Sequence, residues 1–135
     1  MKNNKAVINT YPTIYDIDLV VANKHVTMKQ LRELYNDSDN TELEDITDIG
    51  LCVTTMVKNK KTGRLVSLVK YCCDSEIKDI DKDTNLVNIC SHEAVHVALD
   101  IYRQIYSKVN LDDQEPFAYF IGWVTERIYE TLRKQ

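Results

Sequence analysis

The segment from Thr84 to Ser107 constrains the fold most, because its apolar residues recur with the period of an α-helix. The side chains that this period makes available for a core are Leu86, Ile89, Val97, Ile101 and Ile105. A helix with one apolar face is stabilised mainly by packing that face against a sheet or other helices. The sequence therefore predicts one long helix, and the rest of the chain has to supply the surface that covers it.

Shorter segments on both sides of this helix predict a small sheet and two further helices. Apolar and acidic side chains alternate in the first of them, as in a half-buried strand. Thr27 and Gln30 have the spacing of a helix capping box. Two β-branched runs flank a polar turn that contains Gly63, which is typical of a hairpin. The predicted elements are a strand over 14–22, a short helix over 27–36, a hairpin of strands 51–58 and 64–72, and a final helix over 115–133.

The order strand, helix, hairpin, helix, helix is typical of an α+β domain. We expect a small sheet, mixed or antiparallel, packed on the long helix and on the C-terminal helix. The acidic stretches 37–48 and 74–84 are predicted to be connections. With 135 residues and no internal repeat, the chain is predicted to form a single domain, 1–135, in which residues 1–13 are an N-terminal extension.

Composition limits the partners of the protein. The formal net charge is −4, so the chain lacks the basic surface that nucleic acid requires. No apolar run approaches the ~20 residues that span a bilayer, and the first residues are too weakly apolar for a secretory signal. We therefore expect no nucleic-acid or membrane partner and a cytoplasmic location. The four cysteines contain no CxxC pair and are predicted to be reduced residues that fill the core.

The stretch CSHEAVHVAL, residues 90–99, contains the candidate functional residues. Residues four apart on a helix share one face, so His92 and His96 can direct two imidazoles at one metal ion. Glu93 is rotated by about 100° from His92 and can reach a bound water without ligating the metal. The alternative is a set of polar helix residues that are hydrogen-bonded or solvated. We favour zinc, because the motif lies among apolar residues and unpaired buried polar groups cost about 1–3 kcal/mol each.

A catalytic zinc site needs a third protein ligand. Asp100 is separated from His92 by about 12 Å of helix rise, so it is predicted to act behind the ligands or as a surface charge. Glu115 is the stronger candidate, because a helical hairpin returns the start of the last helix to the histidines. Asp112 and Glu115 also have the spacing of a capping arrangement, which is the structural alternative. Asp112 and Asp113 are the reserve candidates.

His92-Glu93-x-x-His96 followed by Glu115 resembles the gluzincin class of zinc metallopeptidases over residues 92–115. The layout is also similar to small HExxH proteins of phages that infect gut Bacteroidales, through the hairpin sequence KKTG and the last-helix sequence DQEPFAYFIGW. The resemblance implies a minimal zincin-like fold and a zinc ion held by His92, His96 and Glu115. It also implies that Glu93 is the catalytic base.

The sequence departs from the larger gluzincins at Tyr119, where they carry an acid four positions after the third ligand. A second lobe that would wall a substrate cleft is also missing from the predicted elements. Tyr119 and Asp100 remain candidates for oxyanion stabilisation or for a supporting role behind the ligands.

Two functions follow from this reading. The first is zinc-dependent hydrolysis of a peptide or protein substrate, in which Glu93 takes a proton from water and returns it to the leaving amine. The second is a structural protein of a phage virion or of its assembly, with phage structural proteins as partners. Either places the chain in the cytoplasm of a bacterial host, and the second also places it in the virion. A third interpretation is a structural zinc site with no open coordination position, which gives Glu93 no function.

Overall fold

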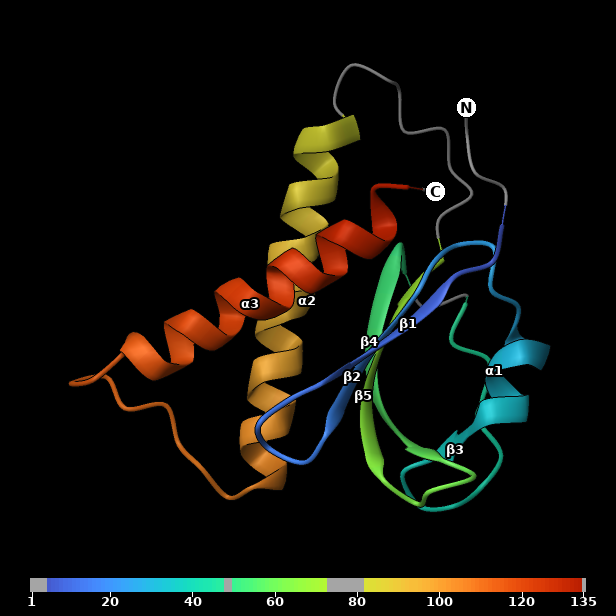
Figure 1. The fold of residues 1–135 in the computed structure, drawn as a ribbon, viewed down its shortest axis with the longest axis horizontal. Coiled ribbons are helices and arrows are strands. Elements are labelled where there is room, and N and C mark those ends of the chain that lie inside the picture. The colour runs from blue at the N-terminus through green and yellow to red at the C-terminus, as the bar shows by residue number, and fades with distance from the viewer. Residues whose placement is uncertain (1–4, 48–49, 73–81, 135) are drawn as a thin grey trace.

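The computed structural model describes residues 5–47, 50–72 and 82–134, which form an α+β domain with a five-stranded mixed sheet (Figure 1). The elements in chain order are β1 (Ile8–Pro12), β2 (Asp18–Ala22), α1 (Met28–Leu34), β3 (Tyr35–Asp37), β4 (Cys52–Asn59), β5 (Leu65–Tyr71), α2 (Lys82–Gln104) and α3 (Glu115–Leu132). None of the helices in the described ranges has the length and apolar character needed to cross a membrane.

Strand β5 is the centre of the sheet. The strand order is β1-β2-β5-β4-β3, in which β2 and β5 run parallel and the other neighbours run antiparallel. All residues of β5 from Val66 to Tyr71 are buried. A strand covered on both faces requires apolar side chains in both directions, and this explains the nearly continuous apolar run LVSLV.

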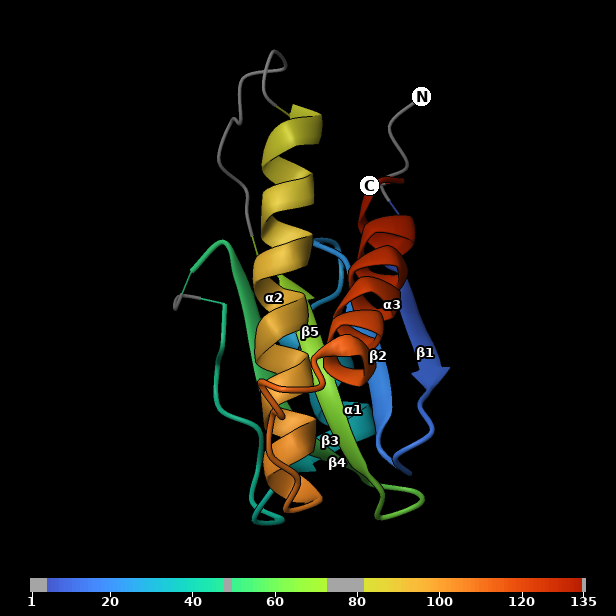
Figure 2. The ribbon, with the colours of Figure 1, turned by 90° about the vertical axis from the view of Figure 1, so that its left-hand side faces the viewer.

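The sheet separates two hydrophobic cores. Helices α2 and α3 lie side by side on one face, and the short helix α1 lies on the other (Figures 1 and 2). The core under the two long helices includes Leu19, Val21, Val69, Ala94, Val97, Ile101, Phe120, Val124 and Ile128. The core under α1 includes Val20, Leu31, Leu43, Ile46, Val57 and Leu68. The larger core therefore fixes the position of α2, which carries the two histidines.

The sequence predictions are confirmed for the hairpin and for both long helices. Gly63 has φ 72°, a conformation that glycine adopts without strain, and its N–H donates to the carbonyl of Asn59 in the β4–β5 turn. The capping box of α1 is also present, because the Thr27 hydroxyl accepts from the N–H of Gln30 and the Gln30 side chain accepts from the N–H of Thr27.

Several predicted boundaries are wrong for local reasons. The strand predicted over 14–22 begins only at Asp18, because the chain turns at Asp16, which has φ 61°. Residues 8–12 are part of the sheet as β1 and so are not an extension. The long helix ends at Gln104, before the predicted end at Ser107, because Tyr106 adopts φ 56° and Ser107 donates back to the carbonyl of Tyr102.

The packing of α2 predicts a large loss of stability when its buried face is truncated. Ile101→Ala removes a side chain that is 0% exposed and should lower the free energy of unfolding by about 2–5 kcal/mol. Ile14→Ala is the matched control, because Ile14 is 90% exposed, and it should stay within about 0.5 kcal/mol of the parent. Urea unfolding followed by circular dichroism measures both, and equal losses would contradict the described packing.

Candidate metal centre

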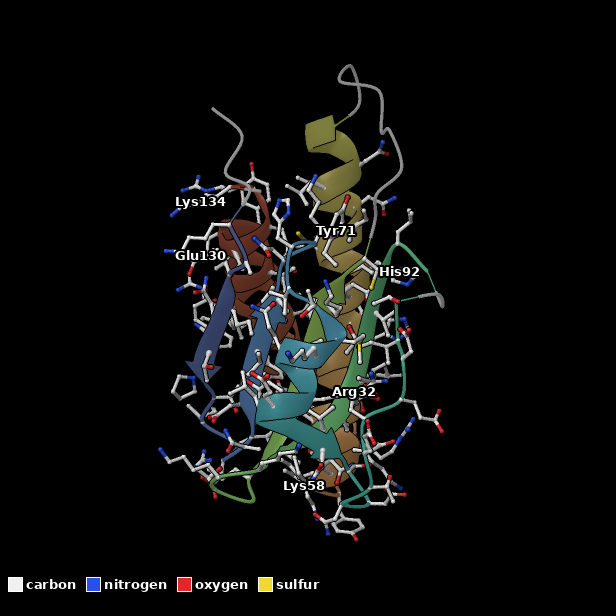
Figure 3. The ribbon with its side chains drawn as sticks, turned by 90° about the vertical axis from the view of Figure 1, so that its right-hand side faces the viewer. Arg32, Lys58, Tyr71, His92, Glu130 and Lys134 are labelled. Atoms are coloured by element: carbon white, nitrogen blue, oxygen red, sulfur yellow. The ribbon has the colours of Figure 1, made fainter. Side chains whose placement is uncertain are left out.

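His92 and His96 lie on the side of α2 that faces away from the large core. Their Nε2 atoms are 3.2 Å apart and their ring centroids are 4.9 Å apart. Both residues are exposed, and the side chain of His92 is 65% exposed. Figure 3 shows His92 beside the first residues of β4.

The distance between the two nitrogens fits a tetrahedral zinc ion. Zinc–imidazole bonds of 2.0–2.1 Å at a tetrahedral angle separate two nitrogens by about 3.3 Å. The separation in the structure is 3.2 Å, so one ion can bind both rings with little rearrangement. Without a metal, the same two atoms can share a proton in a hydrogen bond. The structure therefore brings the two predicted histidine ligands together, and metal binding by them stays a prediction.

Glu93 lies at the boundary between the histidine face and the sheet. It is 6% exposed, and its Oε2 accepts a hydrogen bond of 2.6 Å from the Thr54 hydroxyl on β4. Its other oxygen, Oε1, lies 4.0 Å from Nε2 of His92. The carboxylate is thus held near the His92 imidazole, and its role as a base stays a prediction.

A pocket of about 250 Å³ opens next to this carboxylate. Its lining residues are Leu51, Cys52, Asn88, Ile89, His92 and Glu93. The lining combines the first residues of β4 with one turn of α2, so it places apolar side chains beside the candidate metal and base. A volume of this size accommodates an amino-acid side chain.

The outer edge of β4 is only partly paired. Strand β3 pairs with Val57–Asn59, and the structure describes no strand on that side of residues 52–56. The connection between β3 and β4 passes alongside (Figures 2 and 3), but its described part makes no backbone hydrogen bond to residues 52–56. This stretch begins at the pocket and contains Thr54, the partner of Glu93.

Glu115 does not join the histidines in the structure. It is exposed in the first turn of α3, and α3 lies on the opposite side of α2 from the β3–β4 connection (Figure 2). The reserve candidates Asp112 and Asp113 are exposed in the preceding loop. Among residues 5–47, 50–72 and 82–134, no three His, Cys, Asp or Glu side chains are grouped for a metal ion. Ligation by Glu115 therefore stays a prediction, and it requires α3 or its first turn to move.

The two supporting candidates have different surroundings. Asp100 is partly buried; its burial raises the pKa of the carboxyl, and the charges of Arg103 and His96 lower it. This coupling is consistent with a supporting role one turn beyond His96. Tyr119 is exposed on α3, and the structure shows no contact between its hydroxyl and the histidines. Its predicted role at an oxyanion stays a prediction.

Sequence reasoning missed Thr54, Leu51 and Cys52 as site residues. A signal for Thr54 was present in the sequence, because alternate residues of a strand share one face. Cys52, Thr54 and Met56 form the face of β4 toward α2, and Thr54 is the hydroxyl residue among them. The sequence pattern does not give the position of α2 along β4. This position decides that Thr54 contacts Glu93.

The thiols near the site are poor metal ligands. Burial, together with the charge of Glu93, raises the pKa of the Cys90 thiol to about 12. Burial, and after it the charge of Glu93, also raises the pKa of the Cys52 thiol. Only a thiolate binds zinc strongly or attacks an electrophile, so these residues are better described as packing residues. Cys73 lies outside the described residues.

Alkylation tests this assignment. A thiol whose pKa is raised from 9 to about 12 holds about a thousandfold less thiolate at pH 8. Native Cys90 should therefore react with iodoacetamide at least that much more slowly than Cys90 in the urea-unfolded chain, and its rate should rise with pH up to about 12. Peptide mapping by mass spectrometry measures the rates, and equal rates in both states would contradict the burial of this thiol.

Comparison of the chain with protein-family models, with curated proteins and with solved structures finds no significant match. The geometry of His92, Glu93 and His96 is therefore the basis for a proposed function.

Proposed function

We propose that the protein is a zinc-dependent hydrolase of peptide bonds. The observation that carries this proposal is the convergence of three groups from one helical turn. Nε2 of His92 and Nε2 of His96 are 3.2 Å apart, and the buried carboxylate of Glu93 lies 4.0 Å from the first of them. Two adjacent imidazoles and a nearby carboxylate that does not ligate are the arrangement of an HExxH zinc site.

In this proposal His92 and His96 hold the metal and Glu115 is the predicted third ligand. When bound, zinc supplies Lewis acidity that activates water and polarises a carbonyl group. The fit of the two imidazoles supports this assignment. For Glu115 to reach the metal, the N-terminus of α3 has to move. Pro116 and the loop before it are exposed, so burial of these residues does not prevent the movement.

Glu93 is the proposed general base and acid. Its Oε1 faces the histidines, while its Oε2 is held by Thr54. Fixing one oxygen orients the other, so the carboxylate takes a proton from water and delivers it to the leaving amine without reorienting. Thr54 acts here through Glu93 and is a positioning residue.

The substrate in this proposal is an extended peptide bound along residues 52–56 of β4. A strand added to a sheet edge gains backbone hydrogen bonds, and its alternate side chains point to one face. One such side chain would enter the pocket beside Glu93, between Leu51 and Ile89. The scissile bond would then lie next to the carboxylate and the histidines.

A minimal zincin-like fold is the corresponding proposal for the architecture. It is supported by a helix bearing the HExxH residues that packs on a mixed sheet, with a second helix behind it. The chain keeps its departure at Tyr119, which is exposed and offers no carboxylate to the metal ligands.

Substitution of the base separates binding from chemistry. Glu93→Gln keeps an oxygen that can accept from Thr54 and removes the group that takes the proton, so the zinc content at saturating zinc should stay unchanged. Hydrolysis should fall by at least about a hundredfold. His96→Ala is the contrasting variant and should lose zinc. Metal analysis, together with mass spectrometry of a peptide library incubated with each variant, measures both effects, and undiminished cleavage by Glu93→Gln would remove Glu93 from the mechanism.

The third ligand has its own test. Glu115→Ala should weaken zinc binding by at least about tenfold if Glu115 ligates, since supporting groups alone alter affinity by that much. Glu126→Ala is the control, because Glu126 is also an exposed acid of α3 and is not among the ligand candidates. Competition with a chromophoric chelator measures the affinities, and equal affinities of the two variants would exclude Glu115.

The second candidate function is a structural role in phage assembly, inside the host cytoplasm or in the virion. The observation that favours it is the incomplete ligand set, since the described residues bring no third donor to the histidines. Its partners in this proposal are phage structural proteins. A chain that binds zinc and cleaves no peptide in the library assay would support this candidate over the hydrolase.

A further inference from the structure

The histidine face of α2 is an incomplete zinc site on an exposed surface. We propose that a second copy of the chain completes it, so that two copies share one zinc ion through His92 and His96 of each. The inference rests on the metal-binding part of the proposed function and needs no hydrolysis.

The coordination geometry supports a shared ion. Structural zinc is almost always bound by four tetrahedral ligands. The two Nε2 atoms, 3.2 Å apart, occupy two neighbouring corners of such a site. No other His, Cys, Asp or Glu of the described residues joins them in a group of three. A two-fold axis through the ion places an identical pair at the two remaining corners, and two-fold dimers are the commonest oligomers.

The surface around the histidines is suited to contact with a second helix. Val95 and Leu99 lie three and seven positions after His92, so they belong to the same side of α2 as the two rings. They are 39% and 41% exposed, whereas Ala94, Val97 and Ile101 are fully buried. In a dimer centred on the ion, these side chains pack against the partner and lose their contact with water.

The other faces of α2 are already occupied. Ala94, Val97 and Ile101 pack in the large core with the sheet and α3. Glu93 is buried against Thr54 and stays on the chain's own side of the interface. Its carboxylate then adds negative charge beside a dication held by neutral imidazoles, which favours the metal.

The shared site has a consequence for the hydrolase. Four imidazoles leave no position for water on the ion. Dimer formation therefore switches hydrolysis off. Zinc at half an equivalent per chain favours the shared site, and an individual site requires one equivalent.

The test uses the full untagged chain, because a histidine tag would itself bind zinc. The metal-free protein is mixed with half an equivalent of zinc and measured by light scattering coupled to gel filtration, with metal analysis of the peak. The expected result is a change from 15.7 kDa to twice that mass, with one zinc per two chains, reversed by EDTA. Cobalt in place of zinc should give the visible spectrum of a four-coordinate site.

Three variants make the test specific. His92→Ala and His96→Ala should each stay monomeric with zinc, and their circular dichroism should match the parent because both side chains are exposed. His25→Ala should dimerise like the parent, since His25 precedes α1 on the other side of the sheet. Leu99→Asp should weaken dimerisation at least tenfold while the two zinc ligands remain.

The outcomes distinguish this inference from the proposed function. One zinc per chain in a monomer at every zinc ratio would overturn the dimer and support the individual site. A zinc-linked dimer that also forms with the Glu93→Gln variant would support the shared site, whatever the hydrolytic activity of the protein. Absence of zinc binding would overturn both proposals, and a dimer that persists in EDTA or in His96→Ala would overturn the shared ion.

Discussion

The helical period of α2 directs some of its side chains into the large core and others toward solvent. The candidate site lies at the boundary between these two groups of side chains. Each residue turns by about 100°, so Ala94, Val97 and Ile101 point into the core while His92 and His96 point away from it. Because protein interiors are close-packed, the helix cannot rotate without opening cavities among these residues. The free energy of core packing therefore fixes the direction of the imidazoles.

Glu93 connects this boundary to the sheet. It is the residue of α2 that meets Thr54, and the hydrogen bond of 2.6 Å sets the height of the histidine turn relative to β4. The pocket, the two imidazoles and the outer edge of β4 at residues 52–56, where the structure describes no neighbouring strand, come together at that level. A helix shifted by one turn along the strand would separate these features. One short polar contact thus gives the site its geometry, while apolar packing provides its stability.

Period and turn chemistry in the sequence predicted the hairpin, the capping box of α1 and both long helices. They did not predict β1 and β3, because five and three residues are too few to show a period and both strands lie at sheet edges. The proximity of His92 and His96 was predictable because both residues come from one helix. The position of Glu115 was not, since the spacing between His96 and Glu115 does not say on which side of α2 the last helix packs. Helix α3 packs on the side away from the imidazoles, through Phe120, Val124 and Ile128.

The burial of Glu93 is the strongest reason to expect a cation on this face. A carboxylate that is 6% exposed has lost most of its hydration, and removing a charge from water costs several kcal/mol unless partners replace the water. Thr54 satisfies one oxygen, and the other faces His92 at 4.0 Å. If this surface had only a structural role, an apolar residue in place of Glu93 would give the folded state a lower free energy. In the proposed site, a dication held by the neighbouring imidazoles would offset the desolvation of the carboxylate directly, whether the remaining ligands come from α3 or from a second copy.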